Sequence, residues 1–196
     1  EPFFISEQTR SLTNWNNIQI GLTNPKDIRN NAYFGVTDVK IDNKEGNYVV
    51  QNPVKSVLAE LTIIIENVPK GTEMSGKALD AAWCLFPTQK NSDGEYGLPS
   101  IEPTEVELPT LLATESTLKS EVIRLMPTIQ GSPASHVYLR LLLPDETLQE
   151  FDITAPKMNV GGKYELRFKY EEMQPKMNLE ATINGWTNLN NEVETK

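Results

Sequence analysis

Hydrophobic and polar residues alternate with a period of two along much of this chain. Near the C-terminus, Tyr164, Leu166, Phe168 and Tyr170 alternate with charged residues. Residues 57–65 show the same alternation and include three consecutive isoleucines, a β-branched run that favours strand over helix. A period of two is typical of strands with one buried face and one solvated face. The pattern therefore predicts a protein built from β-strands.

The same reading places further strands along the chain, separated by turns rich in proline, glycine and asparagine. The expected strands are Ile18–Ile20, Tyr33–Ile41, Tyr48–Val50, Val57–Ile65, Trp83–Phe86, Glu105–Leu108, Glu121–Met126, His136–Leu143, Thr147–Ile153, Tyr164–Tyr170 and Met177–Ile183. Residues 33–41 and 48–50 read as a hairpin-like pair. Residues 74–82 also fit two turns of helix, and 87–103 read as a loop with a turn at 91–95.

Many short strands with little helix predict an all-β fold, an antiparallel β-sandwich of the transthyretin-like, Greek-key type. An α+β fold with a helix near residues 74–82 is the alternative. The composition changes near Pro53. We therefore expect residues 54–196 to form the sandwich domain, and 1–53 to be a segment of polar loops and a hairpin, either the first strands of the sandwich or the remnant of a preceding domain.

Charge and cysteine content narrow the classes of partner and compartment. The formal net charge is -9 and the pI about 4.7. Nucleic acid is disfavoured as a partner because phosphate binding needs a surplus of basic side chains on one face. Cys84 is the only cysteine, so a disulfide within the chain is excluded. No apolar run approaches the roughly 20 residues that a membrane-spanning helix needs.

The chain offers little material for catalysis or metal binding. His136 is the only histidine, so any Ser-His-Asp or Cys-His unit would depend on it. It begins a predicted strand, where an exposed or half-buried structural position is expected. Cys84 lies between Trp83 and Leu85 and is expected to be an inert core thiol. Together, one cysteine and one histidine do not make a zinc site.

Acidic residues raise the possibility of a calcium site and of a glycosidase site. In both cases a solvated turn is the simpler interpretation of the pattern. Asn91, Asp93 and Glu95 alternate as the oxygen ligands of a calcium loop do, but the later glutamate of that pattern is missing. Carboxylate pairs also occur at 145–146 and 171–172. A glycosidase needs carboxylates facing each other across a cleft, which neighbouring positions do not supply. We expect no catalytic residue, no metal and no cofactor.

Aromatic side chains supply an alternative function, glycan binding by stacking on sugar rings. Trp15 lies among asparagines and is expected to be exposed, and Tyr96 is the second candidate. Trp83 lies in an apolar run and Trp186 ends an alternating segment. Both are expected to be core or edge plugs.

Three segments resemble the fimbrillin-like proteins of Bacteroidetes, which form or anchor type V pili. The family's late segment, Gly-x-x-Tyr-x-Leu-x-Phe and then an apolar strand ending in Ile-x-x-Trp, is matched here by eight residues: Gly162, Tyr164, Leu166, Phe168, Leu179, Ala181, Ile183 and Trp186. Residues 52–63 resemble the strand that opens the family's C-terminal domain. Residues 32–35 resemble the end of its N-terminal domain.

The resemblance implies a mechanical function rather than a reaction. In that family a strand of one subunit completes the sheet of the next, so backbone hydrogen bonds supply attachment and alternating side chains supply register. The candidate exchange or edge strands are the first and the last predicted, with Ile18 and Ile20 in one and Leu179, Ala181 and Ile183 in the other. Open edges that are not used in this way promote aggregation.

We therefore expect a non-enzymatic cell-surface protein acting in pilus assembly, anchoring or adhesion. Its expected partners are other pilus or surface subunits, with glycan as the alternative ligand. The resemblance also implies an extracellular location associated with the outer membrane, through a lipid anchor outside this chain. It leaves open whether the role is that of a stalk, tip or anchor subunit.

Overall fold

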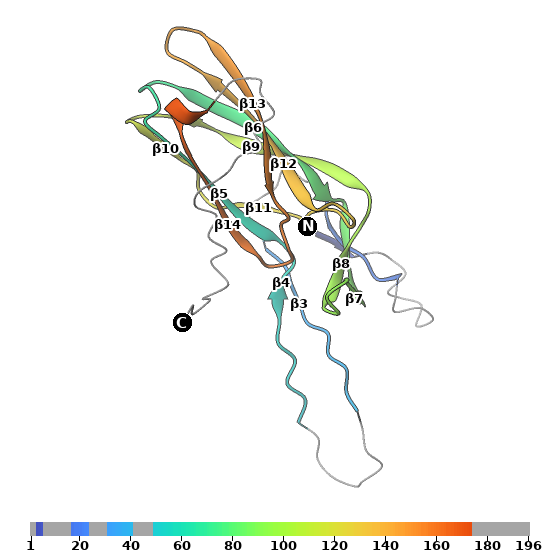
Figure 1. Cartoon of the computed structure of the whole chain (residues 1–196). Coiled ribbons are helices and arrows are strands. Elements are labelled where there is room, and N and C mark those ends of the chain that lie inside the picture. Colours follow the sequence, from blue (N-terminus) through green and yellow to red (C-terminus); the bar gives the residue numbers. More distant parts are fainter. Residues whose placement is uncertain (1–2, 6–16, 24–30, 41–48, 174–196) are drawn as a thin grey trace, which may run out of the picture.

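The computed structural model describes residues 3–5, 17–23, 31–40 and 49–173, and strands dominate it (Figure 1). The strands are β1 (Phe3–Ile5), β2 (Ile20–Leu22), β3 (Tyr33–Phe34), β4 (Lys55–Ser56), β5 (Ala59–Glu66), β6 (Glu73–Ala82), β7 (Cys84–Lys90), β8 (Tyr96–Pro99), β9 (Pro103–Leu112), β10 (Thr117–Lys119), β11 (Ile123–Leu125), β12 (Ala134–Leu142), β13 (Leu148–Pro156) and β14 (Lys163–Lys169). A short 3-10 turn, Tyr170–Glu172, follows β14. The prediction of an all-β fold is confirmed.

Two sheets form the body of the sandwich. In the first, the strand order is β13-β12-β6-β9 and every pairing is antiparallel. In the second, β5 is central and pairs with β10, β11 and β14. Because β14 pairs along nearly the whole of β5, the short strands β10 and β11 share the opposite edge of β5.

The core lies between these sheets and follows directly from the alternation in the sequence. In β5, Ala59, Leu61, Ile63 and Ile65 are fully buried. The facing sheet contributes the alternate side chains of β12 and β13 to the same cluster: Val137, Leu139, Leu141, Phe151, Ile153 and Ala155. Each fully buried aliphatic or aromatic side chain contributes about 1.5–3 kcal/mol relative to its exposed state. The period of two in the sequence thus arises because each strand buries one of its two faces.

One long hairpin crosses from this body into a third sheet. β6 continues into β7 past Trp83, the hairpin turns at residues 91–95, and β8 continues into β9. The prediction of a turn at 91–95 is confirmed. The third sheet has the order β1-β2-β7-β8. The long hairpin therefore ties the N-terminal strands to the sandwich.

The structure decides a point that the sequence left open in this hairpin and corrects another. Residues 74–82 form strand β6 rather than helix, because they pair with β12 on one side and β9 on the other. Such pairing on both edges overrides a weak local helix propensity. The predicted loop 87–103 contains the end of β7 and all of β8. Prolines at both 87 and 99 hid these strands from the sequence reading.

The pairing of β14 departs from the expected antiparallel arrangement. β14 runs parallel to β5, with Tyr164 opposite Leu61 and Phe168 opposite Ile65. The chain returns to β5 only after passing through the other sheet, and such a crossover allows parallel pairing. Alternation in the sequence gives the buried face of a strand and leaves its neighbour and direction open.

The predicted hairpin of residues 33–41 with 48–50 is also wrong in its pairing. Here β3 pairs with β4, so Tyr33 lies opposite Ser56 and Phe34 opposite Lys55. Residues 35–40 and 49–54 run outside any strand and project away from the body (Figure 1). β2 pairs with β7 as well, so two strand pairings cross the boundary expected at residue 53.

Candidate functional site

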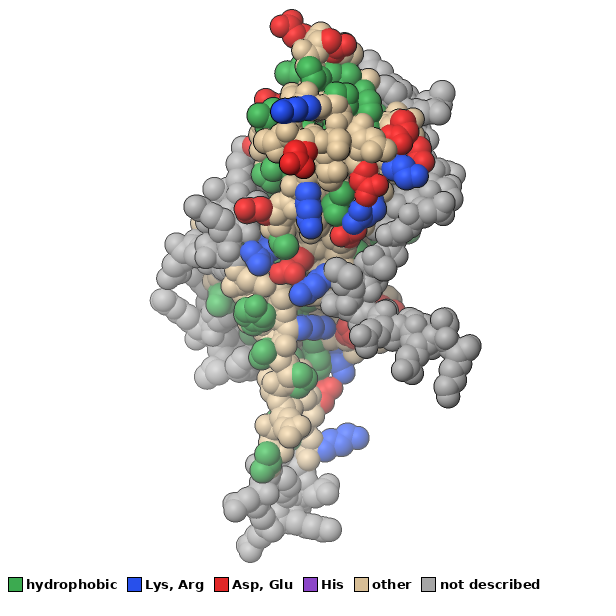
Figure 2. All heavy atoms as spheres, turned by 90° about the vertical axis from the view of Figure 1, so that its left-hand side faces the viewer, with side chains coloured by type: hydrophobic (Ala, Val, Ile, Leu, Met, Phe, Trp, Pro, Cys, Tyr) green, Lys and Arg blue, Asp and Glu red, His purple; other side chains and the backbone are tan. Residues whose placement is uncertain are grey.

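The outer face of the second sheet is covered by ion pairs between strands. Glu60 of β5 contacts Arg124 of β11 at 3.3 Å and Lys163 of β14 at 3.5 Å. Arg167 of β14 contacts both Glu66 of β5 and Glu165. Figure 2 shows basic and acidic side chains mixed over the body of the molecule rather than separated into patches. This mixture fits a solvated face and gives no surface for a polyanion.

Two of the edge strands of the sandwich come one after the other in the chain, β13 in the first sheet and β14 in the second, while β9 is the other edge strand of the first sheet. Among the described residues, β13 pairs only with β12, and β14 pairs only with β5. A strand paired on one side presents a row of free backbone N–H and C=O groups on the other. Such a row is the template for adding a strand from another chain.

The direction of the backbone groups along β14 follows from one hydrogen bond. The Gly162 carbonyl accepts the N–H of Glu60 at 2.8 Å, so residue 162 is turned toward β5. Backbone groups alternate in direction along a strand. Tyr164, Leu166 and Phe168 therefore also turn their N–H groups toward β5, and Glu165 and Arg167 turn theirs toward the open edge.

The same reasoning applies to β13, through the turn that precedes it. Leu143 N–H donates to the carbonyl of Thr147 at 2.9 Å, so residue 147 is turned toward β12. Along β13 the N–H groups of Glu150, Asp152 and Thr154 then face the open edge. Their side chains also point away from the core, whereas Phe151 is buried.

Apolar side chains lie half-buried at the β14 end of the core. Phe168 and Tyr170 pack against the hydrophobic cluster without being covered completely. On the loop that leads into β14, Val160 does the same. A strand added next to β14 would remove more of this apolar surface from water, at about 25 cal/mol per Å².

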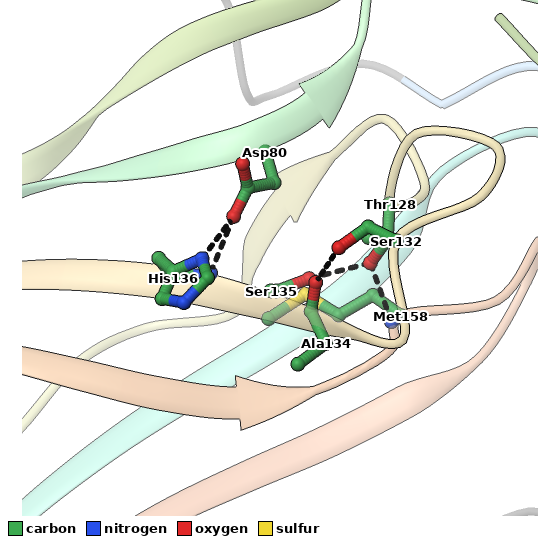
Figure 3. Close-up of polar contacts among 7 residues, drawn as sticks. All are labelled: Asp80, Thr128, Ser132, Ala134, Ser135, His136 and Met158. Carbon is green, nitrogen blue, oxygen red and sulfur yellow. Dashed lines mark hydrogen bonds and ion pairs between the residues drawn. The ribbon is translucent and has the colours of Figure 1, made fainter. Parts of the chain in front are cut away.

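His136 forms a polar contact with Asp80 rather than a catalytic unit (Figure 3). The Asp80 carboxylate accepts the backbone N–H of His136 at 2.9 Å and its ring Nδ1 at 2.6 Å. Nearby, the buried Thr128 hydroxyl bonds Ser135 and accepts the N–H of Met158 at 2.7 Å. The hydroxyl groups in this cluster bond strand backbone and one another. The sequence reading expected a structural role for His136 and missed its partner, which lies 56 residues earlier in the chain.

Cys84 is buried, as predicted, and burial raises the pKa of its thiol while a hydrogen bond to Ser100 opposes that shift. A raised pKa suppresses the thiolate that a nucleophile or metal ligand requires. Across the part of the chain that the structure describes, no group of three or more His, Cys, Asp or Glu side chains is arranged to hold a metal ion.

The asparagine and acidic residues at 91–95 form a turn. The Asn91 side-chain oxygen accepts the N–H groups of Asp93 at 2.9 Å and Glu95 at 3.0 Å. This is the local bonding by which asparagine stabilises a tight turn. A calcium loop would use this Asn91 oxygen as a ligand, but here it already accepts two backbone N–H groups.

The aromatic candidates are not gathered into a stacking surface in the described residues. Tyr96 is half-buried, its hydroxyl bonds Asp38 at 2.5 Å, and the Lys90 ammonium lies 4.6 Å from its ring centroid. Trp83, expected to be a core or edge plug, is 42% exposed and therefore does not belong to the core. The reason is that Ala82 and Cys84 on either side of it are buried, so Trp83 is turned outward at the bend between β6 and β7. Trp15 and Trp186 lie outside the described residues.

Of the two predicted exchange strands, the structure describes only the first. Ile20 begins β2, which pairs with β1 and β7, and Ile18 lies half-buried just before that strand. Leu179, Ala181 and Ile183 lie outside the described residues. The open edges of β13 and β14 were not identified from the sequence. Their charged alternate positions, Glu150, Asp152, Glu165 and Arg167, were the signal available for them.

No helix in the described part of the chain is long and apolar enough to cross a membrane.

Chains of similar structure include two from Bacteroides ovatus ATCC 8483. One, assigned provisionally as a cell adhesion protein, is 11% identical, with a TM-score of 0.39, and the match covers 62% of this chain and 42% of that one. The other, assigned provisionally as an adhesin, is 10% identical, with a TM-score of 0.42, and the match covers 89% of this chain and 72% of that one. This chain thus spans less than half of the first relative. Both TM-scores lie below 0.5, so the fold assignment rests on the strands described above.

Sequence comparison gives a family assignment. No curated protein matches the chain. The sequence profile of the fimbrillin-A associated anchor proteins Mfa1 and Mfa2 matches residues 3–192. This match includes nearly the whole sequence and agrees with the resemblance seen in residues 162–186. The chain belongs to the family of fimbrillin-A associated anchor proteins Mfa1 and Mfa2.

Proposed function

We propose that this chain is a non-enzymatic anchor or accessory subunit of a fimbria, which holds a neighbouring subunit by strand addition at the open edge of β14. Family membership supports the fimbrial role. The observation that carries the mechanism is the edge itself, where β14 is paired with β5 on one side only within the described residues. An extended segment of the neighbour would pair with the outward backbone groups of Glu165 and Arg167.

Three features favour β14 over β13 as the acceptor. The first sheet already has four strands of nine or ten residues. In the second sheet only β5 and β14 are of comparable length, because β10 and β11 have three residues each. A strand next to β14 would make the two layers more equal and cover the half-buried Phe168.

Charge is the third feature. The outward side chains of β13 include Glu150, which contacts Arg140 at 3.5 Å, and Asp152, whereas β14 carries three basic side chains, Lys163, Arg167 and Lys169, and one acidic one, Glu165. Charged side chains on an edge oppose the approach of another strand. The excess of basic side chains on β14 opposes an acidic neighbour less than the acidic side chains of β13 do.

The proposed location is the cell surface, in association with the outer membrane. The attachment to the membrane would come from a lipid anchor. In this arrangement the sandwich transmits force between the membrane and the fimbria. Backbone hydrogen bonds along a whole strand suit that task, because a load applied along the strand is shared among many bonds.

A complementation experiment tests the mechanism. Cells lacking the gene would be complemented with the full protein carrying Glu165→Pro and Arg167→Pro, which remove two outward N–H groups and leave the bonds to β5. We expect fimbriae to be shed into the medium, measured by immunoblotting of fimbrillin in the cell and medium fractions. The matched control, Glu165→Ala with Arg167→Ala, changes the same side chains, keeps both N–H groups and should retain fimbriae on cells.

Two further measurements keep the result interpretable. Circular dichroism and thermal unfolding of the purified variants show whether the sandwich still folds. Asp152→Pro removes an outward N–H from β13 instead and should leave the fimbriae attached. Fimbriae that stay on cells expressing a folded double-proline variant would refute strand addition at β14. Fimbriae that are shed only with Asp152→Pro would move the site to β13.

A further inference from the structure

The extended segments that project from the body, residues 35–40 and 49–54, form a feature that the proposed function does not use. We call them the arm. Outside the arm, most strands of the molecule are paired in sheets. Among the described residues, the backbone N–H and C=O groups of the arm form no hydrogen bonds beyond the β3–β4 pair at its root. Within the described part of the chain these groups have no backbone partner, and a segment of another chain could pair with them.

The root of the arm is fixed to the β7–β8 hairpin. Asp38 contacts Lys90 at 2.9 Å and accepts the hydroxyl hydrogen of Tyr96. On the other segment, Lys55 contacts Glu95 at 3.4 Å and lies over the ring of Phe34, 5.6 Å from its centroid. Contacts from both segments hold the arm in one place relative to the body. Because it is already held in place, the arm would lose less conformational entropy than a free loop would when another segment docks on it.

The arm also exposes apolar side chains in unusual density. Val49 is 89% exposed and Val54 68% exposed, Val39 and Val50 are exposed as well, and Tyr33 is exposed on β3 at the root of the arm. Figure 2 shows separate apolar side chains along the narrow lower extension, with charged side chains between and beside them. Several exposed apolar side chains in one part of the molecule mark an interaction surface more often than isolated exposed residues do.

A pocket of about 190 Å³ lies at the root of the arm. It is lined from both segments and from β8, by Phe34, Gly35, Val36, Pro53, Val54, Lys55 and Tyr96. The two segments approach closely here, since a Cβ added at Gly35 would lie 2.9 Å from the carbonyl oxygen of Pro53. The size and apolar lining suit one large aliphatic or aromatic side chain.

These features together specify the chemistry of the ligand. Free backbone groups call for hydrogen-bond donors and acceptors spaced along an extended chain, and the pocket calls for an apolar side chain. A polypeptide strand supplies both, whereas a lipid chain supplies only the second and a glycan has no large aliphatic group. We propose that the arm is a docking surface for an extended segment, apolar at alternate positions, of a different and less acidic protein.

Charge is the reason for choosing a different protein over a second copy. Residues 31–56 carry three basic and three acidic side chains, so the net charge of -9 lies wholly outside them. Two copies of such a chain repel each other through their bodies. The neutral arm is the part of the molecule where another chain meets least repulsion. This inference is independent of β14.

Site-specific photocrosslinking in the full protein on cells tests the proposal. A benzophenone amino acid would replace Val54 in one variant and Ile101, which is 71% exposed and distant in sequence, in the matched control. We expect an adduct from position 54 whose crosslinked peptide, mapped by mass spectrometry, is an extended segment of another protein with alternate apolar residues. Position 101 should give no such adduct.

A second substitution distinguishes strand pairing from nonspecific hydrophobic association. Val50→Pro removes one backbone N–H of the arm and should lower the adduct yield from position 54 about tenfold, whereas Val50→Ala should change it little. Equal adducts from positions 54 and 101 would overturn the proposal, as would an adduct with a lipid, a glycan or a second copy. The double-proline variant of β14 should keep the adduct, so this test and that of the proposed function fail separately.

Discussion

The carboxylate of Asp80, on β6, accepts two hydrogen bonds from His136, on β12, one from the backbone N–H and one from ring Nδ1 (Figure 3). The contact lies where the regular pairing of β6 with β12 has ended, at Ala78 opposite Val137. Beyond this point β6 contacts residues 127–129 instead, with Ala81 bridged to Thr128. Asp80 thus supplies the acceptor that the departing backbone no longer offers.

Removing this acceptor should destabilise the fold. We expect Asp80→Ala to lower the free energy of unfolding by about 1–3 kcal/mol, because it leaves the half-buried N–H of His136 without its partner. Asp80→Asn keeps an oxygen acceptor and should cost less. Denaturant unfolding measures both, with Asp93→Ala at the exposed hairpin turn as the control, for which little change is expected. Equal stability of the Asp80→Ala variant and the parent would show that water replaces the carboxylate at no cost.

The buried hydroxyl of Thr128 should matter for the same physical reason. Thr128→Val keeps the shape of the side chain and removes the acceptor of the Met158 N–H and the partner of Ser135. We expect a loss of about 1–3 kcal/mol in unfolding free energy. Thr128→Ser, which restores the hydroxyl, should recover most of it. A Thr128→Val protein as stable as the parent would show that these hydrogen bonds do not stabilise the fold.

Gly76, on β6, lies where β12 leaves no room for a side chain. A Cβ at this position would lie 2.2 Å from the carbonyl oxygen of Tyr138 and 3.1 Å from a methyl of Leu139. Backbone would have to move, so Gly76→Ala should destabilise the protein by about 1–3 kcal/mol. Ser75→Ala, next to it in the same strand, is the control and should have a smaller effect. Thermal unfolding of the two variants gives the comparison, and a fully stable Gly76→Ala protein would contradict the geometry.

The contact at the root of the arm should depend on pH in a defined direction. The hydrogen bond from Tyr96, and then that from Lys90, hold the pKa of Asp38 below its ordinary value of 3.8. A carboxyl whose pKa is depressed in the folded state stabilises that state above the unfolded pKa, and the stabilisation is lost as pH falls through the lower folded pKa. The arm should therefore stay attached at neutral pH and loosen only below about pH 4.

Carboxyl NMR titration of Asp38 measures this effect. We expect Tyr96→Phe to raise the pKa of Asp38 toward 3.8, because it removes the largest cause of the shift. Tyr33→Phe, a matched change on β3, should leave it unaltered. An Asp38 pKa that does not respond to Tyr96→Phe would mean that the hydroxyl does not bond this carboxylate in solution.

The period of two in the sequence was sufficient to determine that this is an all-β protein and which face of most strands is buried. In β5 and β12 the predicted inward residues, such as Leu61 and Leu139, are fully buried. This works because alternation is a local property: neighbouring side chains of one strand must point to opposite sides. The family resemblance in residues 162–168 could be read for the same reason, since it consists of local alternation and a glycine.

Only the tertiary structure decided which strands are neighbours. The parallel pairing of Tyr164 with Leu61, the strand conformation of residues 74–82 and the outward turn of Trp83 all depend on contacts between distant parts of the chain. So does the Asp80–His136 contact, which joins residues 56 positions apart. The open edge of β14 and the unpaired arm are likewise properties of what lies beside a strand. The sequence determined the faces of this protein, and the packing of its sheets determined its edges, because hydrogen bonding between strands is set by their spatial neighbours and not by their own side chains.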